Sequence, residues 1–293
     1  MFTVTLVHMD EWLSTVDKRL REESPALLPI FKIYADEARF GRTYIDEELQ
    51  QLNKGDSILE VGAGAMLLSC QLVREGFNVT ALEPTGEGFS HFSRMRDLVL
   101  CCANQLNCRP SIINLPAESL SISERFSFAF SINVMEHVDN VQRSILNVGR
   151  SLKPGAKYRF TCPNYLFPYE PHFNIPTLFS KSLTEKVFKH QIFTAAAIND
   201  PAGTWQSLNW INVPQIRKSV RSFNELRVSF NRSLLVETLE RVSHDTAFAA
   251  RRSAWMRSMI GLLVRLRLHQ TLKLIPAAAQ PIIDCSVVKT KSL

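Results

Sequence analysis

Between residues 57 and 164, short apolar stretches alternate with longer amphipathic ones, and this alternation limits the possible folds more than any other feature of the chain. The apolar stretches, rich in Val, Ile and Phe, lie at 57–61, 77–84, 110–118, 126–134 and 156–164. Helical spacing of apolar residues covers 66–75, 88–107 and 138–152. Strands that alternate with helices through short turns predict an α/β fold built on a parallel sheet.

The sequence after residue 165 predicts additions to that sheet rather than a second domain. A strand-like piece lies at 225–230, and the β-branched alternation of 281–291 predicts a terminal strand. Because this last strand follows a long excursion, residues 166–280 are expected to decorate a single sheet. We expect a doubly wound, Rossmann-like, mostly parallel sheet of seven strands. Helices precede it, and a helical insertion comes before its last strand.

The first strand runs into the sequence ILEVGAGAM, residues 58–66, in which small residues follow a single carboxylate. The absence of side chains at Gly62 and Gly64 lets a ligand approach the backbone closely. A dinucleotide fingerprint would need a third glycine at Leu67, and an acidic G-x-G-x-G pattern would need one at Met66. The motif therefore indicates a nucleotide-like ligand without identifying it.

The ends of the later strands carry residues that suit the same ligand. In an open parallel sheet, ligands bind beyond the carboxyl ends of the strands. Glu83 ends the second strand, 19 residues after Gly64, where a carboxylate can accept hydrogen bonds from ribose hydroxyls. Ala117 and Glu118 follow the third strand, beside the expected adenine position. Strand four ends in SINVMEHVDN, which leaves residues 133–137 at the reacting edge.

These motifs together resemble the class I S-adenosylmethionine-dependent methyltransferases, in particular the small-molecule branch that includes the ubiquinone-biosynthesis type. The resemblance covers roughly residues 37–165 and includes LEVGAGAM, LEP, PAES, NVMEHV and LKPGA in the family's order. It implies S-adenosylmethionine as the cofactor and methyl transfer as the activity. Met66 departs from the glycine of the family pattern.

The resemblance also implies which residues contact the cofactor: Glu60, Gly62, Gly64, Glu83, Ala117, Glu118, Asn133 and Val134. Glu60 and the two glycines would surround the methionine part, Glu83 the ribose, and Glu118 the adenine. The segment EARFGRTY, residues 37–44, resembles the lead-in of the family, where Arg42 or Tyr44 would meet the cofactor carboxylate.

Two histidines are candidate bases for the transfer. The methyl carbon of a sulfonium is attacked in line, so the protein mostly supplies positioning and a dry cavity. A hydroxyl or amine acceptor must also lose a proton, for which a histidine of near-neutral pKa is suited. His137 follows strand four, and His172 lies in YLFPYEPHFNIP, which predicts a loop. Each histidine also has a structural alternative, in which it caps or packs near the cofactor.

Two further patterns carry less weight. Glu136, His137, Glu170 and His172 could together bind a divalent cation that orients a catechol-like acceptor, but their spacing is diagnostic of no metal, so no metal ligand is assigned. CPNY, residues 162–165, is similar to the N/D-P-P-Y/F motif of nucleic-acid amino-methyltransferases. It follows strand five instead of strand four and has one proline, so nucleic acid is not expected as the substrate.

A basic, apolar segment lies near the carboxyl end of the chain. Residues 211–275 hold 12 Lys or Arg against 4 acids, in a chain of formal net charge +6. Within 246–274, arginines separate the apolar residues Trp255, Met259, Ile260, Leu262, Leu263, Leu266 and Leu274. These charges argue against a spanning helix, whereas a basic amphipathic helix can lie in a membrane interface. Internal packing or homo-oligomerisation is the alternative.

We expect a single methyltransferase domain over residues 1–293. Its predicted parts are a helical lead-in at 1–52, a cofactor-binding core at 53–165, substrate-side loops with the apolar basic helix at 166–280, and the terminal strand at 281–291. Six cysteines without C-x-x-C spacing indicate a reduced protein. A cytoplasmic location follows, with contact to the inner face of a membrane if the basic segment binds lipid.

The sequence thus predicts methyl transfer to a small-molecule acceptor, lipid- or saccharide-linked, with oxygen as the target atom. Two alternatives stay open. One is an NAD(P)-dependent oxidoreductase, for which Gly62, Gly64 and Glu83 would serve nearly as well. The other is a non-catalytic methyltransferase-fold protein that acts as a binding or scaffold subunit.

Overall fold

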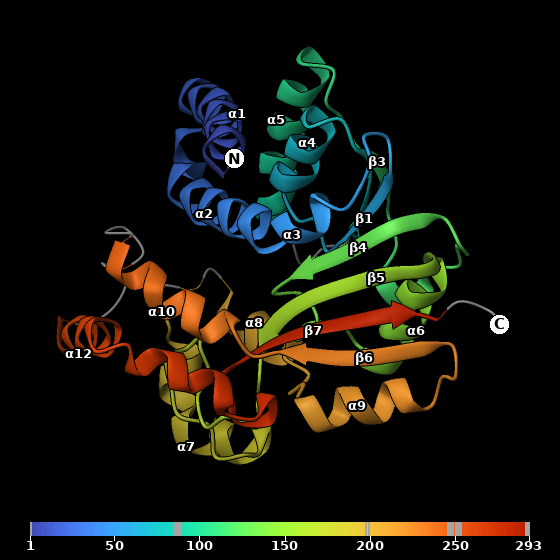
Figure 1. Cartoon of the computed structure of the whole chain (residues 1–293). Coiled ribbons are helices and arrows are strands. Elements are labelled where there is room, and N and C mark those ends of the chain that lie inside the picture. The colour runs from blue at the N-terminus through green and yellow to red at the C-terminus, as the bar shows by residue number, and fades with distance from the viewer. Residues whose placement is uncertain are drawn as a thin grey trace. The chain divides into compact units, whose positions relative to one another are not determined.

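The computed structural model describes residues 2–84, 90–196, 198, 200–244, 249 and 254–290. Its strands are β1 (Ser57–Val61), β2 (Asn78–Leu82), β3 (Ser111–Ile113), β4 (Phe126–Ile132), β5 (Leu152–Pro163), β6 (Leu226–Asn231) and β7 (Ile282–Lys289) (Figure 1). Its helices are α1 (Phe2–Glu23), α2 (Leu28–Tyr44), α3 (Asp46–Leu49), α4 (Leu67–Arg74), α5 (Ser90–Gln105), α6 (Val141–Ser151), α7 (Lys181–Phe193), α8 (Pro201–Ser207), α9 (Val213–Arg221), α10 (Leu234–His244) and α12 (Ala254–Arg265). Short 3-10 helices include η1 (Pro25–Leu27), η3 (Ala117–Ser119), η4 (Leu268–Leu274) and η5 (Ala277–Ala279).

The seven strands form one sheet in the order β3-β2-β1-β4-β5-β7-β6. β1 pairs in parallel with β2 and with β4, and β2 pairs in parallel with β3. The order changes direction between β1 and β4, which is the switch point where ligands bind in doubly wound sheets. The last strand, β7, lies between β5 and β6 and runs opposite to β6 (Figure 1). The predicted doubly wound, mostly parallel sheet with an insertion before its last strand is confirmed.

The chain divides into two compact units. Unit 1 comprises Met1–Val134, Gln142–Arg159 and Val287–Leu293, and unit 2 comprises Met135–Val141 and Phe160–Ser286. Strands β5 and β7 each contribute residues to both units.

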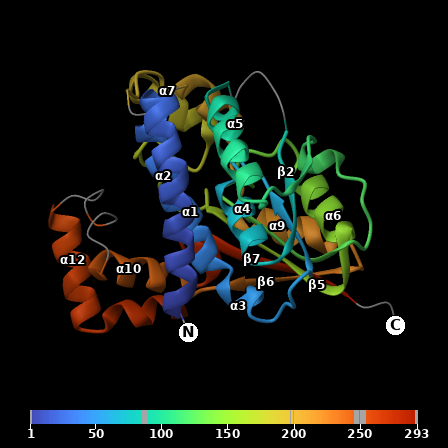
Figure 2. The same cartoon turned by 90° about the horizontal axis from the view of Figure 1, so that it is seen from above.

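Unit 1 holds the core that the strand–helix alternation predicts. β1 and β2 are buried over most of their length because helices cover both faces of the sheet. Figure 2 shows α4 and α5 on one side of these strands and α6 on the other. The lead-in helices α1 and α2 both contact α4. Trp12 of α1 is fully buried and donates from Nε1 to the carbonyl oxygen of Leu67 at 2.9 Å, so the lead-in is part of the unit.

Two strands differ from their expected limits. β3 ends at Ile113 instead of continuing to 118, because Pro116 lacks the N–H that a sheet ladder needs and η3 begins directly after it. β5 begins at Leu152, earlier than expected, and includes the predicted turn. Gly155 allows this, since its φ of 83° lies in the left-handed region that favours glycine.

Unit 2 contains the helices and loops that follow β5. Three of its helices begin at side chains that accept a backbone N–H: Ser180 caps α7, Asp200 caps α8 and Asn212 caps α9. Aromatic rings fill its core, with Trp210 stacked on Tyr165 at 4.4 Å between ring centroids. Among the described helices, none is long and apolar enough to cross a membrane.

Candidate active site

β1 ends in a turn of left-handed backbone. Gly62 has a φ of 71°, Gly64 of 50° and Met66 of 63°. A Cβ at Gly62 would lie 2.6 Å from Cγ1 of Val134, so only glycine fits there. Met66 therefore keeps the glycine-like conformation of the third position, which costs a non-glycine residue about 1–2 kcal/mol. Its side chain is fully buried, so apolar packing compensates for this cost.

Glu83 lies directly beside this turn. The N–H of Gly64 donates to Glu83 Oε2 at 2.8 Å, and the N–H of Gly62 donates to the carbonyl oxygen of Leu82 at 2.8 Å. Burial raises the pKa of Glu83, while the Gly64 N–H and the charge of Arg96 act in the opposite direction. The structure thus brings the strand-end acid and the glycines together, as the motif spacing predicts.

Glu60 adds a second, more deeply buried acid to the same place. Its carboxylate accepts a hydrogen bond from the hydroxyl of Ser69 on α4. Burial, opposed by the hydrogen bond from Ser69 and assisted by the neighbouring carboxylates of Glu83 and Glu37, raises the pKa of Glu60 to about 8. A site with this concentration of acids is suited to a positively charged ligand, which would relieve their mutual repulsion.

Helix α2 contributes two residues that the sequence interpretation missed. Glu37 accepts a hydrogen bond from Asn133 Nδ2 at 2.7 Å, at the end of β4. Burial raises the pKa of Tyr34, and the charges of Glu37 and Glu83 act in the same direction. Gly41 allows α2 to approach closely, since a Cβ there would lie 2.8 Å from Leu68 Cδ2. Helical spacing places these three residues on one face of α2, a signal that groups them without telling which way that face points.

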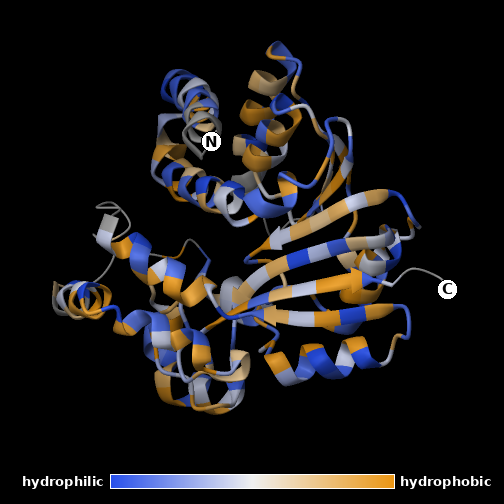
Figure 3. Cartoon of the chain, in the orientation of Figure 1, coloured by the Kyte–Doolittle hydropathy of each residue, from blue (hydrophilic) through white to orange (hydrophobic). Residues whose placement is uncertain are grey.

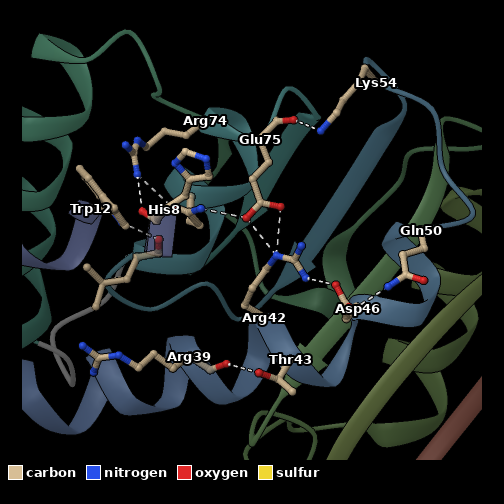
Figure 4. Close-up of polar contacts among 12 residues, drawn as sticks. His8, Trp12, Arg39, Arg42, Thr43, Asp46, Gln50, Lys54, Arg74 and Glu75 are labelled. Atoms are coloured by element: carbon tan, nitrogen blue, oxygen red, sulfur yellow. Dashed lines mark hydrogen bonds and ion pairs between the residues drawn. The ribbon is translucent and has the colours of Figure 1, made fainter. Parts of the chain in front are cut away.

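Arg42 lies elsewhere, and we correct the expectation that it meets the cofactor. Its Nε donates to both carboxylate oxygens of Glu75 at 2.9 and 3.0 Å, and its Nη1 donates to Asp46 at 2.8 Å (Figure 4). Glu75 follows α4 and precedes β2, at the edge of the sheet where the strands begin rather than end. The alternative residue, Tyr44, is buried with the guanidinium of Arg159 4.1 Å from its ring centre.

Ala117 and Glu118 form the start of η3, after β3. Ala117 is buried, and the carbonyl oxygen of Glu118 accepts a hydrogen bond from Asn147 Nδ2 of α6 at 2.6 Å. This bond fixes the backbone of the turn. The placement of both residues beside an adenine stays a prediction.

Unit 2 brings the two predicted histidines together. Their rings are 5.5 Å apart at an interplanar angle of 70°. Nδ1 of His137 lies 2.8 Å from Ser207 Oγ, and Nδ1 of His172 lies 2.6 Å from Glu170 Oε1. Tyr165 OH also donates to Glu170, at 3.2 Å. Burial lowers the pKa of His137 to about 4, and the neighbouring His172 acts in the same direction against the charge of Glu170.

The histidine pair also has a donor set for a metal. One ligand atom each from Glu136, His137 and His172 lie within 4.8 Å of one another. A carboxylate with two imidazoles is a set that zinc and other divalent transition metals accept. Glu170, the fourth residue of the pattern seen in the sequence, bonds Nδ1 of His172, as the outer partner of a histidine ligand does.

Comparison with known proteins identifies the family. Residues 35–216 match a family model described as a methyltransferase domain. The chain belongs to this family. The matched segment includes the β1 turn, Glu83, the end of β4 and both histidines of this methyltransferase, and the predicted membership is confirmed.

Relatives of this methyltransferase cover the chain to different extents. The uncharacterized protein Rv1509 of Mycobacterium tuberculosis is 46% identical over 281 residues, which are 96% of this chain and 95% of that protein. A ubiquinone biosynthesis O-methyltransferase of Rickettsia bellii is 31% identical over 97 residues, 33% of this chain and 38% of its own. The solved structure of geranyl diphosphate C-methyltransferase from Streptomyces coelicolor has the same fold, with a TM-score of 0.50 and 11% identity over 89% of this chain and 79% of that one.

Proposed function

We propose that this methyltransferase transfers the methyl group of S-adenosylmethionine to an oxygen atom of a small-molecule acceptor. One observation carries the proposal: the left-handed glycine turn after β1 is hydrogen-bonded to Glu83 and lies beside the buried Glu60. This combination offers close backbone approach, a carboxylate for a ribose and negative charge for a cation.

The residues at the ends of β1, β2 and β4 fit this cofactor. S-adenosylmethionine carries a sulfonium and an ammonium, and the acids Glu37, Glu60 and Glu83 favour positive charge at the site. Its ribose presents two hydroxyls to a carboxylate such as Glu83. When bound, the cofactor supplies an electrophilic methyl group. The proposed contacts are Glu60, Gly62, Gly64, Glu83, Ala117, Glu118, Asn133 and Val134.

His172 is the proposed base. Glu170 holds Nδ1 of this ring at 2.6 Å, which fixes the ring orientation and stabilises the imidazolium that forms when the other nitrogen takes a proton. His137 has a pKa of about 4, so it stays neutral at physiological pH and is a weak base. We assign it the role of orienting the acceptor hydroxyl.

His172 can take the proton that an acceptor hydroxyl needs to lose. An amine acceptor must lose a proton as well, so the choice of oxygen as the proposed target rests on the partial similarity to ubiquinone biosynthesis O-methyltransferases. The acceptor class is a lipid- or saccharide-linked small molecule. Membership of the methyltransferase-domain family favours methyl transfer over the oxidoreductase alternative.

Methyl-labelled S-adenosylmethionine tests the proposal, with a prenylated catechol and an alkyl glucoside as acceptors. Label should enter the catechol or the glucoside as an ether. His172→Ala should lower kcat by about 10²–10⁴-fold, the usual contribution of a general base, and leave cofactor affinity unchanged. Full activity of this variant would contradict the assigned base. Cofactor binding without any turnover would favour the scaffold alternative.

A further inference from the structure

Helix α12 and the 3-10 helix η4, in unit 2, expose an unusual set of apolar side chains. The large apolar residues of these elements and of the turn between them that have exposed fractions between 46% and 77% are Met259, Leu262, Leu266, Leu268 and Leu274. A single exposed leucine is ordinary on a protein surface. Five exposed large residues in this short segment form a patch, and exposed apolar patches mark sites of interaction.

The patch is one face of a helix that is already held by its other face. Met259 and Leu262 lie three residues apart on one side of α12, and Leu266 follows four residues later, directly after the end of the helix. Ile260 is buried, and α12 packs against α10, as Figures 1 and 2 both show. His269 of η4 bonds Glu240 of α10 through Nε2 at 2.8 Å. The exposed apolar face is therefore not needed to hold the helix in place.

The charged side chains of the segment from Ala254 to Leu274 are all basic, and the neighbouring acid Glu240 of α10 pairs with His269. Arg257, Arg265 and Lys273 of these two elements are exposed, as is Arg267 in the turn between them. The sequence has no Asp or Glu between Asp245 and Asp284. Figure 3 shows hydrophobic and hydrophilic residues mixed along α12. The sequence analysis also counts Trp255 among the apolar residues of this segment, but the side chain of Trp255 is not among those that the structure describes.

We propose that these nine residues form a surface, called here the α12–η4 face, that docks on anionic phospholipid membranes. The apolar side chains enter the boundary between headgroups and acyl chains, and the basic side chains pair with lipid phosphates and carboxylates. Each cation near such a surface strengthens binding roughly fivefold. The absence of acids within the segment itself favours a lipid surface of uniform negative charge as the partner. The inference goes beyond the proposed function, because docking requires no methyl transfer.

Sedimentation with vesicles tests this surface in the full chain. The protein should bind phosphatidylcholine vesicles that contain phosphatidylserine, bind pure phosphatidylcholine weakly, and lose affinity as salt rises. Arg257→Glu with Arg265→Glu should weaken binding by at least about 25-fold, from two cations at roughly fivefold each. The matched control, Lys218→Glu with Arg221→Glu, makes the same charge change on the exposed side of α9 and should bind nearly as the original protein does.

A second pair of variants separates the apolar contribution from the charge. Leu262→Ser with Leu266→Ser should also lose most vesicle binding, while Leu183→Ser with Val187→Ser, at similarly exposed positions of α7, should not. All four side chains are exposed, so the variants should keep the original melting temperature.

Three results would overturn the inference: no binding of the original protein to anionic vesicles, equal losses in the test and control variants, or self-association that disappears in Leu262→Ser with Leu266→Ser while no vesicle is bound. The last result would assign the face to a second copy of the chain. Because vesicle binding is measured without cofactor or acceptor, its failure and the failure of methyl transfer are separate outcomes.

Discussion

Replacing Gly62 by alanine should destabilise the fold, because the φ of 71° disfavours any Cβ and the added atom would lie 2.6 Å from Val134. The left-handed backbone and the overpacking together cost roughly 2–4 kcal/mol. Urea unfolding measures the change. Val134→Ala in the same chain should recover the packing part of the loss and leave the backbone part. A Gly62→Ala variant as stable as the original protein would contradict the described turn.

Glu60 should make cofactor binding depend on pH. Its pKa of about 8 means that this carboxyl holds a proton at neutral pH in the free protein. A bound cation favours the charged form, so binding releases a proton and affinity rises as pH increases toward about 8. Calorimetry in two buffers of different ionisation enthalpy measures the released proton. Glu60→Gln should bind without proton release, and a pH-independent affinity of the original protein would contradict the assignment.

At the scale of elements, Arg42 joins α2, α3 and the end of α4 through Asp46 and Glu75. Arg42→Ala should destabilise the protein by about 3 kcal/mol, because it leaves two largely buried carboxylates without their cation. Cofactor affinity should stay unchanged, since Arg42 lies at the edge of the sheet where the strands begin, whereas the proposed cofactor site lies where they end. Thermal unfolding and calorimetry measure the two effects. Unchanged stability with a large loss of affinity would restore Arg42 to the cofactor site.

The sequence predicts elements better than it predicts contacts between them. β1 has the predicted limits because a strand buried on both faces is a short continuous apolar run, and α5 lies within the predicted 88–107 because its apolar residues follow the helical period. Arg42 and Glu37 belong to the same segment of α2, and local pattern does not tell which one faces the strand ends. The partner of Arg42 is 33 residues away, and the partner of His137 is 70 residues away.

At the scale of the whole molecule, a single domain should unfold in a single transition. The two compact units are not separate lengths of chain, since β5 and β7 each have residues in both. Neither unit can therefore lose its strands without disturbing the other. Differential scanning calorimetry should show one peak whose calorimetric and van't Hoff enthalpies agree. Two resolved peaks would contradict the single domain.

Titration calorimetry with S-adenosylmethionine, S-adenosylhomocysteine, NAD and NADP tests the assignment of the cofactor most directly. The two sulfur compounds should bind. Glu83→Ala should weaken the binding of both sulfur compounds roughly tenfold to a hundredfold, since hydrogen bonds to a charged group contribute about 1.5–3 kcal/mol. Glu47→Ala, at an exposed acid of α3, should bind as the original protein does. Binding of NAD or NADP in place of the sulfur compounds, or an affinity indifferent to Glu83, would contradict the proposed methyltransferase site.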